Sequence, residues 1–170
     1  MKTLKSLIVI LFFLFVESSF AATNTKPTLT YDLGASTGTY SGYGYTEINL
    51  GLNWSLYDYL TWRNSFFSRS VQSLSSVSGL DSSARFSWEV ATDGGGLGLG
   101  VFAGPGIRFS KKESSATFVE VGLTVKLGGL NIGGGFKTLF YNSPGTDASG
   151  VDLPKSDTGY FIVLSGGGAF

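Results

Sequence analysis

Apolar and polar residues alternate without a break in Thr46-Glu-Ile-Asn-Leu-Gly-Leu-Asn-Trp54, the stretch that decides the fold. Ile48 and Leu50 fall on one face of an extended chain, whereas Glu47 and Asn49 fall on the other. Successive side chains of a β-strand point to opposite faces, so this pattern predicts a strand that lies between two different environments.

Seven other segments repeat the alternation, so the predicted fold is all-β. The predicted strands are roughly ten or more residues long, as a tilted strand must be to cross a bilayer. Together with the stretch above they make eight, an even number, and they predict an antiparallel up-and-down transmembrane β-barrel. Within these seven predicted strands the alternation is read over 29–35, 60–66, 85–90, 97–109, 119–127, 130–140 and 158–170.

The predicted connections differ in length on the two sides of the sheet. Short links follow the second, fourth and sixth strands, and longer polar loops follow the third, fifth and seventh, as is typical of outer-membrane barrels. The link after the first strand, around 38–41, is short and is an exception. An even strand count then places both termini on the short-turn side, the periplasm. The short links are Tyr57-Asp58, 93–96 and Gly128-Gly129, and the loops are 70–83, 110–115 and 142–157.

Charged residues of the predicted strands all lie on the polar face. An eight-stranded barrel is just wide enough for side chains to fill, so these charges are predicted to pair inside it. On the opposite face a charge would meet lipid, at a cost of roughly 2–4 kcal/mol at mid-bilayer. The alternative for any one of them is a solvent-facing position on a soluble sheet. The acids are Asp32, Glu47, Glu89 and Glu120, and the bases are Arg63, Arg85, Arg108, Lys126 and Lys137.

Aromatic residues of the apolar face fall near the strand ends. Two aromatic girdles are expected where amphipathic rings sit at the level of the lipid headgroups. Core packing in a β-sandwich is the alternative explanation. The predicted periplasmic girdle is Tyr31, Trp54, Trp62, Trp88 and Phe170, and the opposite one is Phe109, Phe140 and Tyr160.

Residues 1–21 are predicted to be a cleaved signal peptide, which leaves 22–170 as one barrel domain. Lys2 and Lys5 precede the apolar run 7–16, and small residues at Ser19 and Ala21 fit the positions that a signal peptidase reads. The apolar run is too short for a membrane-spanning helix, which needs roughly 20 residues. The chain has a formal net charge of 0, which does not indicate a nucleic-acid partner.

Composition removes most catalytic and metal chemistry, and the chain is predicted not to be an enzyme. It has no Cys and no His, so a disulfide framework, a thiolate nucleophile, a Cys- or His-based zinc site and a Ser-His-Asp triad are all excluded. A Ser–Lys pair using Lys126 or Lys137 stays formally open. The segment 98–103 matches a dinucleotide fingerprint, but it continues as a strand and offers no helix N-terminus.

Two loop features have simple explanations. Asp147, Asp152 and Asp157 could ligate Ca²⁺, although their spacing is not that of an EF-hand and Asp is common in solvated loops. Lys111 and Lys112 could contact lipopolysaccharide phosphates or be an exposed pair. No catalytic, cofactor or metal residue is therefore predicted.

The last segment is Tyr160-Phe-Ile-Val-Leu-Ser-Gly-Gly-Gly-Ala-Phe170, which places Tyr160, Ile162, Leu164 and Phe170 on one face. With the export signal and the eight-stranded meander, it resembles the closing strand of the small outer-membrane barrels of the OmpA, OmpX and opacity-protein group. Gly166 and Gly168 depart from the pattern, because larger apolar residues usually hold such lipid-facing positions.

The resemblance implies a non-enzymatic, surface-antigen-like protein of the Gram-negative outer membrane. It would contribute to envelope structure or surface contact through its loops. Its partners would be lipid, lipopolysaccharide and the barrel-assembly machinery, which would read the strand ending at Phe170, and a monomer is favoured. Two alternatives stay open: a narrow pore, and a soluble periplasmic carrier of lipocalin type, in which the apolar faces would point inward around an apolar ligand.

Overall fold

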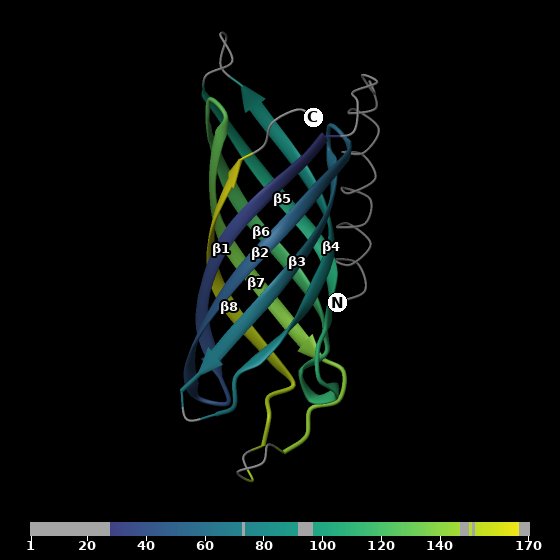
Figure 1. Cartoon of the computed structure of the whole chain (residues 1–170), viewed down its shortest axis with the longest axis vertical. Coiled ribbons are helices and arrows are strands. Elements are labelled where there is room, and N and C mark those ends of the chain that lie inside the picture. Colours follow the sequence, from purple (N-terminus) through teal and green to yellow (C-terminus); the bar gives the residue numbers. More distant parts are fainter. Residues whose placement is uncertain (1–27, 73, 92–96, 147–149, 151, 167–170) are drawn as a thin grey trace, which may run out of the picture.

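Eight antiparallel strands close into one barrel in the computed structural model, which describes residues 28–72, 74–91, 97–146, 150 and 152–166. Each strand pairs with its neighbours in chain order, and β1 pairs with β8 to close the cylinder (Figure 1). The predicted all-β, eight-stranded up-and-down barrel is confirmed. The strands are β1 Thr28–Tyr40, β2 Tyr43–Tyr57, β3 Leu60–Val71, β4 Val77–Ala91, β5 Leu97–Phe109, β6 Ala116–Leu127, β7 Leu130–Tyr141 and β8 Ser156–Gly166.

Some sequence predictions fall outside the described residues: the signal peptide 1–21, the turn 93–96, Asp147, Gly168 and Phe170. Within the described part of the chain, no helix has the length and apolarity required to cross a membrane.

The two ends of the barrel differ, as the predicted connections indicate. The turn end carries the β2–β3 and β6–β7 turns, and the loop end carries the β5–β6 connection, with its 3-10 helix Lys112–Ser114, and the β7–β8 connection (Figure 1). The β1–β2 link at the loop end is the tight turn Ser41-Gly42, and both of its residues have positive φ (52° and 81°). Such turns match the twist of the strands that they join, so this exception to the loop-length pattern is confirmed.

The prediction of a serine-rich loop at 70–83 is wrong. β3 continues to Val71 and β4 already begins at Val77, and their ladder runs from Leu60↔Phe86 to Arg69↔Val77. Serine is common in loops, but nothing in its side chain prevents it from pairing in a sheet. The two-residue period persists through the segment, with Leu80 exposed on the outside and Asp81 buried inside. The predicted last loop is likewise too long, because β8 begins at Ser156.

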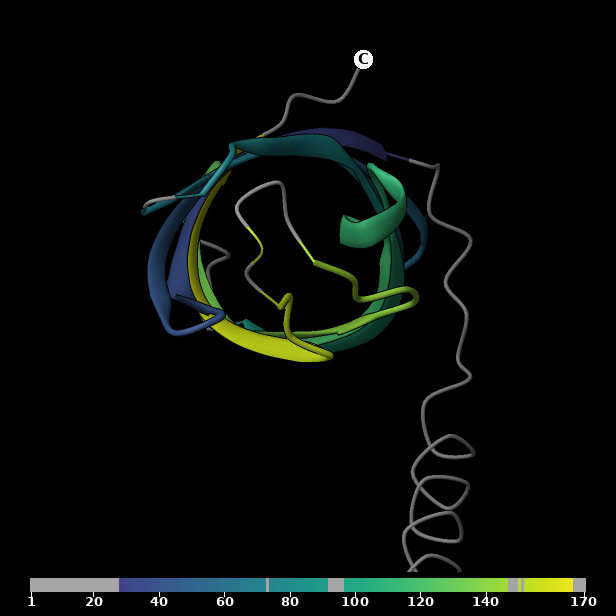
Figure 2. The same ribbon diagram turned by 90° about the horizontal axis from the view of Figure 1, so that it is seen from below.

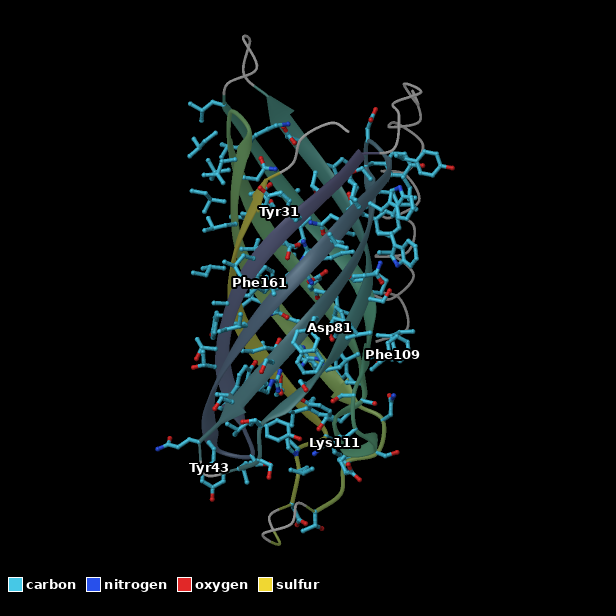
Figure 3. All side chains as sticks on the ribbon, in the orientation of Figure 1. Tyr31, Tyr43, Asp81, Phe109, Lys111 and Phe161 are labelled. Carbon is cyan, nitrogen blue, oxygen red and sulfur yellow. The ribbon has the colours of Figure 1, made fainter. Side chains whose placement is uncertain are left out.

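Apolar side chains point away from the barrel axis and polar ones point toward it. Ile48 and Leu50 are more than half exposed, at 56% and 59%. Glu47, which directly precedes Ile48 in β2, is 1% exposed. Figure 3 shows the same contrast for Phe109, which projects from the barrel wall, and Asp81, which lies within it. A carrier of lipocalin type requires the opposite arrangement, with apolar side chains inside, and the structure rules it out.

Most of the exposed aromatic residues of the described chain lie near the strand ends, whereas Phe66, Phe136 and Tyr160 lie farther in. At the turn end the rings of Trp54 and Trp62 stack at 6.4 Å, and Trp88 is also exposed. Phe140 lies next to the end of β7 at the loop end, as predicted, but Tyr160 lies farther from the rim, opposite Phe136 in the β7–β8 ladder.

Candidate functional site

Within the part of the chain that the structure describes, ten charged side chains fill the lumen, and their charges balance. All of them are buried except Arg85, whose side chain is 13% exposed. Because each ion contacts an opposite charge, the free-energy cost of removing the ions from water is smaller than the several kcal/mol of an unpaired ion. This lumen ion network consists of Asp32, Glu47, Asp81, Glu120 and Asp157 with Arg63, Arg69, Arg85, Arg108 and Lys137.

Arg108 of β5 is the centre of the network. Its guanidinium donates two hydrogen bonds to Glu47 (2.8 and 2.9 Å) and two to Asp81 (both 2.8 Å). Lys137 of β7 donates to the same Asp81 carboxylate. The Arg108 guanidinium also lies over the ring of Phe67, 3.6 Å from its centroid. Planar, charge-assisted hydrogen bonds on both sides hold this guanidinium in one orientation.

Arg69 of β3 extends the network to the loop end. It donates to Glu47 (2.7 Å), to Asp157 (2.7 Å) and to the hydroxyl of Tyr141 (2.9 Å). The Tyr141 hydroxyl in turn donates to Asp157 at 2.5 Å, and the ring of Tyr45 lies 3.9 Å from the guanidinium. Five side chains from four strands are therefore held together where the loops begin.

An apolar cluster seals the lumen beyond Arg69. Its buried members come from five strands, β1, β2, β3, β6 and β7, and Leu153 of the β7–β8 connection packs against them. Seen from the loop end, the β7–β8 connection and the 3-10 helix lie across the opening of the ring (Figure 2). The loop end is therefore closed by packed side chains. The cluster consists of Tyr40, Tyr45, Val71, Ala116, Phe118, Leu139 and Tyr141.

Two simpler pairs lie nearer the turn end. Arg63 donates to both oxygens of Asp32, at 2.7 and 2.8 Å, and the side-chain amide of Asn53 donates to Asp32 at 2.9 Å. Arg85 donates to both oxygens of Glu120, at 2.7 and 3.0 Å. Each acid here serves one arginine, in contrast to the shared acids around Arg108.

A gap of only about 20 Å³ lies inside the network, beside Glu47, Arg63, Arg85, Glu120 and Lys137. A single water needs roughly 10–15 Å³ of such space, so this gap holds one or two waters at most. The middle of the lumen is therefore filled by side chains.

A larger cavity of about 240 Å³ lies between the network and the turn end, and we call it the turn-end cavity. Arg85 and Phe102 lie at its inner limit, and Asp58 of the β2–β3 turn lies at its outer limit. Glu89, also on its lining, accepts a hydrogen bond of 3.0 Å from Lys126, and both of these side chains are exposed. Most of the wall is small and polar: Thr30, Asn53, Ser55, Thr61, Ser87, Gly100, Thr124, Asn131 and Ser165.

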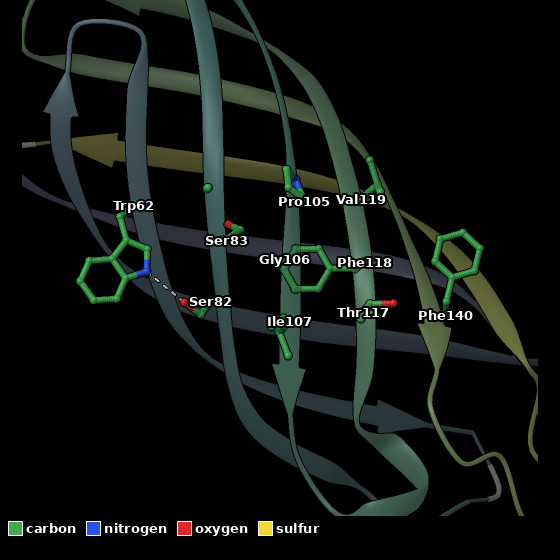
Figure 4. A pocket seen from close by; sticks show the side chains of 11 residues that line it. Trp62, Ser82, Ser83, Pro105, Gly106, Ile107, Thr117, Phe118, Val119 and Phe140 are labelled. Carbon is green, nitrogen blue, oxygen red and sulfur yellow. Dashed lines mark hydrogen bonds between the residues drawn. The ribbon is translucent and has the colours of Figure 1, made fainter. Parts of the chain in front are cut away.

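A hollow of about 540 Å³ lies on the outer surface over β3 to β7 (Figure 4). Trp62 forms one side and Phe140 the other, and the Trp62 indole donates to the Ser82 hydroxyl at 3.0 Å. Pro105 lies in its floor, and no β4 residue pairs with it in the ladder, since proline has no backbone N–H. Between Trp62 and Phe140 the outward residues Ser82, Ala84 and Thr117 are small, which leaves the hollow open.

The predicted lumen residues all lie on the inner face, but they do not all belong to the network. Glu89 and Lys126 pair with each other at the mouth of the turn-end cavity, and the other seven belong to the network.

Sequence reasoning missed Arg69, Asp81 and Asp157, although each keeps the inward position of the two-residue period. Asp81 and Asp157 were assigned to loops. Following the period through the serine-rich segment would have found Asp81.

The structure also shows where the lysines of the possible Ser–Lys pair and two of the possible Ca²⁺ ligands lie. Lys126 and Lys137 have carboxylate partners, Glu89 and Asp81. Asp157 is buried in the network, whereas Asp152 is exposed in the loop, so the structure separates these two of the three possible Ca²⁺ ligands. Among the described residues, no three acidic side chains lie close enough together to hold a metal ion.

Comparison with solved structures shows a likeness in fold. No protein-family model matches the chain, and no curated protein matches it. A solved structure described as "De novo design of transmembrane beta-barrels" superposes with a TM-score of 0.57 at 14% identity. The match covers 85% of this chain and 98% of the designed one. The fold resembles that of a transmembrane β-barrel.

Proposed function

We propose that the protein is a non-enzymatic outer-membrane β-barrel with a side-chain-filled lumen, which contributes to envelope structure or surface contact through its loop end. The observation that carries the proposal is a continuous apolar outer face. Soluble monomers rarely expose apolar patches larger than a few hundred Å². Here every strand contributes a large apolar side chain that is 41–67% exposed: Leu33, Leu50, Phe66, Leu80, Leu99, Leu123, Ile132 and Ile162.

The energetic argument concerns both faces together. In water, the outer face would leave apolar surface exposed at roughly 25 cal/mol per Å². In a bilayer the same apolar surface contacts lipid acyl chains and not water, and a closed barrel leaves no unpaired strand edge in the hydrocarbon. The ions are already paired inside. Strands of 11 to 15 residues are also long enough, because a tilted strand crosses a bilayer in roughly 9–11 residues.

The proposal includes an orientation and a set of partners. Outer-membrane barrels have short periplasmic turns and longer outer loops, which supports a periplasmic turn end and periplasmic termini. The signal peptide 1–21 would export the chain, and the segment ending at Phe170 would engage the barrel-assembly machinery. Lipid and lipopolysaccharide would surround a monomer. Membership of the OmpA, OmpX and opacity-protein group is part of this proposal.

A narrow pore is the second candidate, and the turn-end cavity is the observation that favours it. The cavity reaches into the lumen from one end, but the network and the apolar cluster fill the rest. The structure therefore favours the plugged barrel, and we expect no steady channels of porin size in planar bilayers.

Fractionation and gel mobility test the proposal. We expect the protein in the outer-membrane fraction, and we expect unboiled samples to migrate differently from boiled ones on SDS gels, since a closed barrel resists SDS until it is heated. Recovery in the soluble periplasmic fraction, with mobility unchanged by boiling, would overturn the membrane assignment. Deletion of loop residues 142–155 then tests the role of the loop end: we expect the deletion to reduce surface contact of the cells that carry the protein.

A further inference from the structure

We propose that the turn-end cavity is a binding site for a small, neutral, polyhydroxylated molecule of about the size of a monosaccharide. The wall of the cavity offers hydroxyl and amide groups from several strands, and Phe102 adds an aromatic ring at its inner limit. At about 240 Å³ the cavity is smaller than the roughly 300–1,000 Å³ of sites for drug-sized ligands, so its occupant is small.

Two asparagines supply the observation that points to a ligand. Within the described part of the chain, the side-chain oxygens of Asn53 and Asn131 are buried without a hydrogen-bond partner, and both residues line the cavity. Asn53 is only 7% exposed, and its NH₂ group donates to Asp32. That bond fixes the orientation of the amide, so the oxygen cannot turn toward Asp32. Buried acceptors without donors are costly, and hydroxyl groups are suitable donors.

Asn49 and Asp157 also have one buried oxygen each without a partner among the described residues, but neither lines this cavity. Of these four unpaired oxygens, those of Asn53 and Asn131 therefore belong to residues that line the cavity. They lie on β2 and β7, on different parts of the wall, so one molecule with several hydroxyl groups suits them better than one with a single donor.

Charge decides against an ionic ligand. Arg85 is bound through both oxygens of Glu120, and Glu89 is paired with Lys126. Neither arginine nor glutamate is therefore available to a second ion without breaking a pair. Asp58, at the outer limit, is also not without an interaction partner. Apart from Asp58, Trp88 and Phe102, the remaining wall is made of neutral hydroxyl, amide and glycine positions, which recognise neutral polar groups.

The site would be open to molecules at the turn end only, because packed side chains close the loop end. It goes beyond the proposed membrane role, which rests on the outer face. A failed binding experiment would leave that role intact, whereas a soluble protein would still possess the cavity.

Side-chain amide NMR of the full-length folded barrel tests the site. The protein is held in dodecylphosphocholine micelles, whose headgroup has no hydroxyl groups, and is titrated with glucose and sorbitol. We expect saturable shifts of the Asn53 and Asn131 signals, with half-saturation in the roughly millimolar range that so small a ligand allows. The signal of Asn64, which is exposed on the outer face, should not move.

Matched variants make the test specific. Asn131→Ala should weaken glucose binding roughly two- to tenfold, as the loss of one hydrogen bond predicts, and Asn64→Ala should leave it unchanged. Ser87→Leu should abolish binding by filling the cavity. Thr124→Val, which keeps the side-chain shape and removes a hydroxyl, decides the matter if Asn131→Ala does not fold.

The proposal is overturned by any of four results. These are shifts that do not saturate with either probe, equal losses in Asn131→Ala and Asn64→Ala, binding that survives Ser87→Leu, and gluconate binding as well as glucose.

Discussion

The two halves of the lumen share one strand pattern but differ in packing. The loop-end half is filled by arginine and aromatic side chains around Arg108 and Arg69, and the turn-end half encloses a cavity of about 240 Å³. Inward positions near the loop end carry long side chains such as Tyr45, Phe118 and Tyr141, whereas those near the turn end carry short ones such as Ser87 and Thr124. Side-chain size at the inward positions, and not strand geometry, therefore decides which half is closed.

The largest expected effect comes from removing the central cation. Arg108→Met leaves Glu47 and Asp81 buried with fewer donors, and breaking a buried ion pair from one side costs roughly 3–5 kcal/mol. Urea unfolding of the barrel in lipid vesicles measures this loss. A change below about 1 kcal/mol would contradict a tightly coupled loop-end half.

Removing single acids should have intermediate effects. Glu47→Ala should cost roughly 2–3 kcal/mol, because both of its arginines keep another carboxylate, Asp157 or Asp81. Glu120→Ala should cost roughly 1–3 kcal/mol, since Arg85 lies beside the cavity, where water can reach it. Both variants should lose heat-modifiable mobility at a lower temperature than the native barrel. Unchanged transition temperatures for both would count against a stabilising ion network.

A matched pair of enlargements compares the filled part of the lumen with the cavity. Ser65, an inward residue of β3, is 1% exposed and accepts a hydrogen bond from Arg63, whereas Ser87 lines the cavity. Ser65→Leu should destabilise the barrel by roughly 1–3 kcal/mol through overpacking, and Ser87→Leu by less than about 1 kcal/mol. The same unfolding measurement decides, and equal losses would mean that the filled part of the lumen and the cavity do not differ in packing.

The smallest effect is expected at the mouth. Lys126 pairs with Glu89, but both side chains are more than 40% exposed, and such pairs contribute about 0–1 kcal/mol. Lys126→Met therefore serves as the control for Arg108→Met in the same unfolding experiment. A loss as large as that of Arg108→Met would show that the turn-end half is as tightly coupled as the loop-end half.

The sequence predicts the fold and the direction of each side chain better than it predicts the contacts. Strict alternation around Glu47 is sufficient to place its carboxylate inside. The high serine content of 70–83 predicts a loop that would include Asp81, but the two-residue period of the strand continues through this segment and Asp81 pairs with Ser65 in the β3–β4 ladder. Which charges meet could not be predicted, because Glu47 and Arg108 lie on β2 and β5, across the lumen, and their heights depend on the stagger of the closed barrel.

If apolar side chains face lipid while the ions are enclosed, the three tryptophans of the chain should report it. Trp54, Trp62 and Trp88 are all on the outer face near the turn end. In vesicles that contain brominated lipids, we expect strong quenching of their fluorescence by the lipids and little quenching by water-soluble acrylamide. Fluorescence that acrylamide quenches and brominated lipids leave unchanged would contradict it.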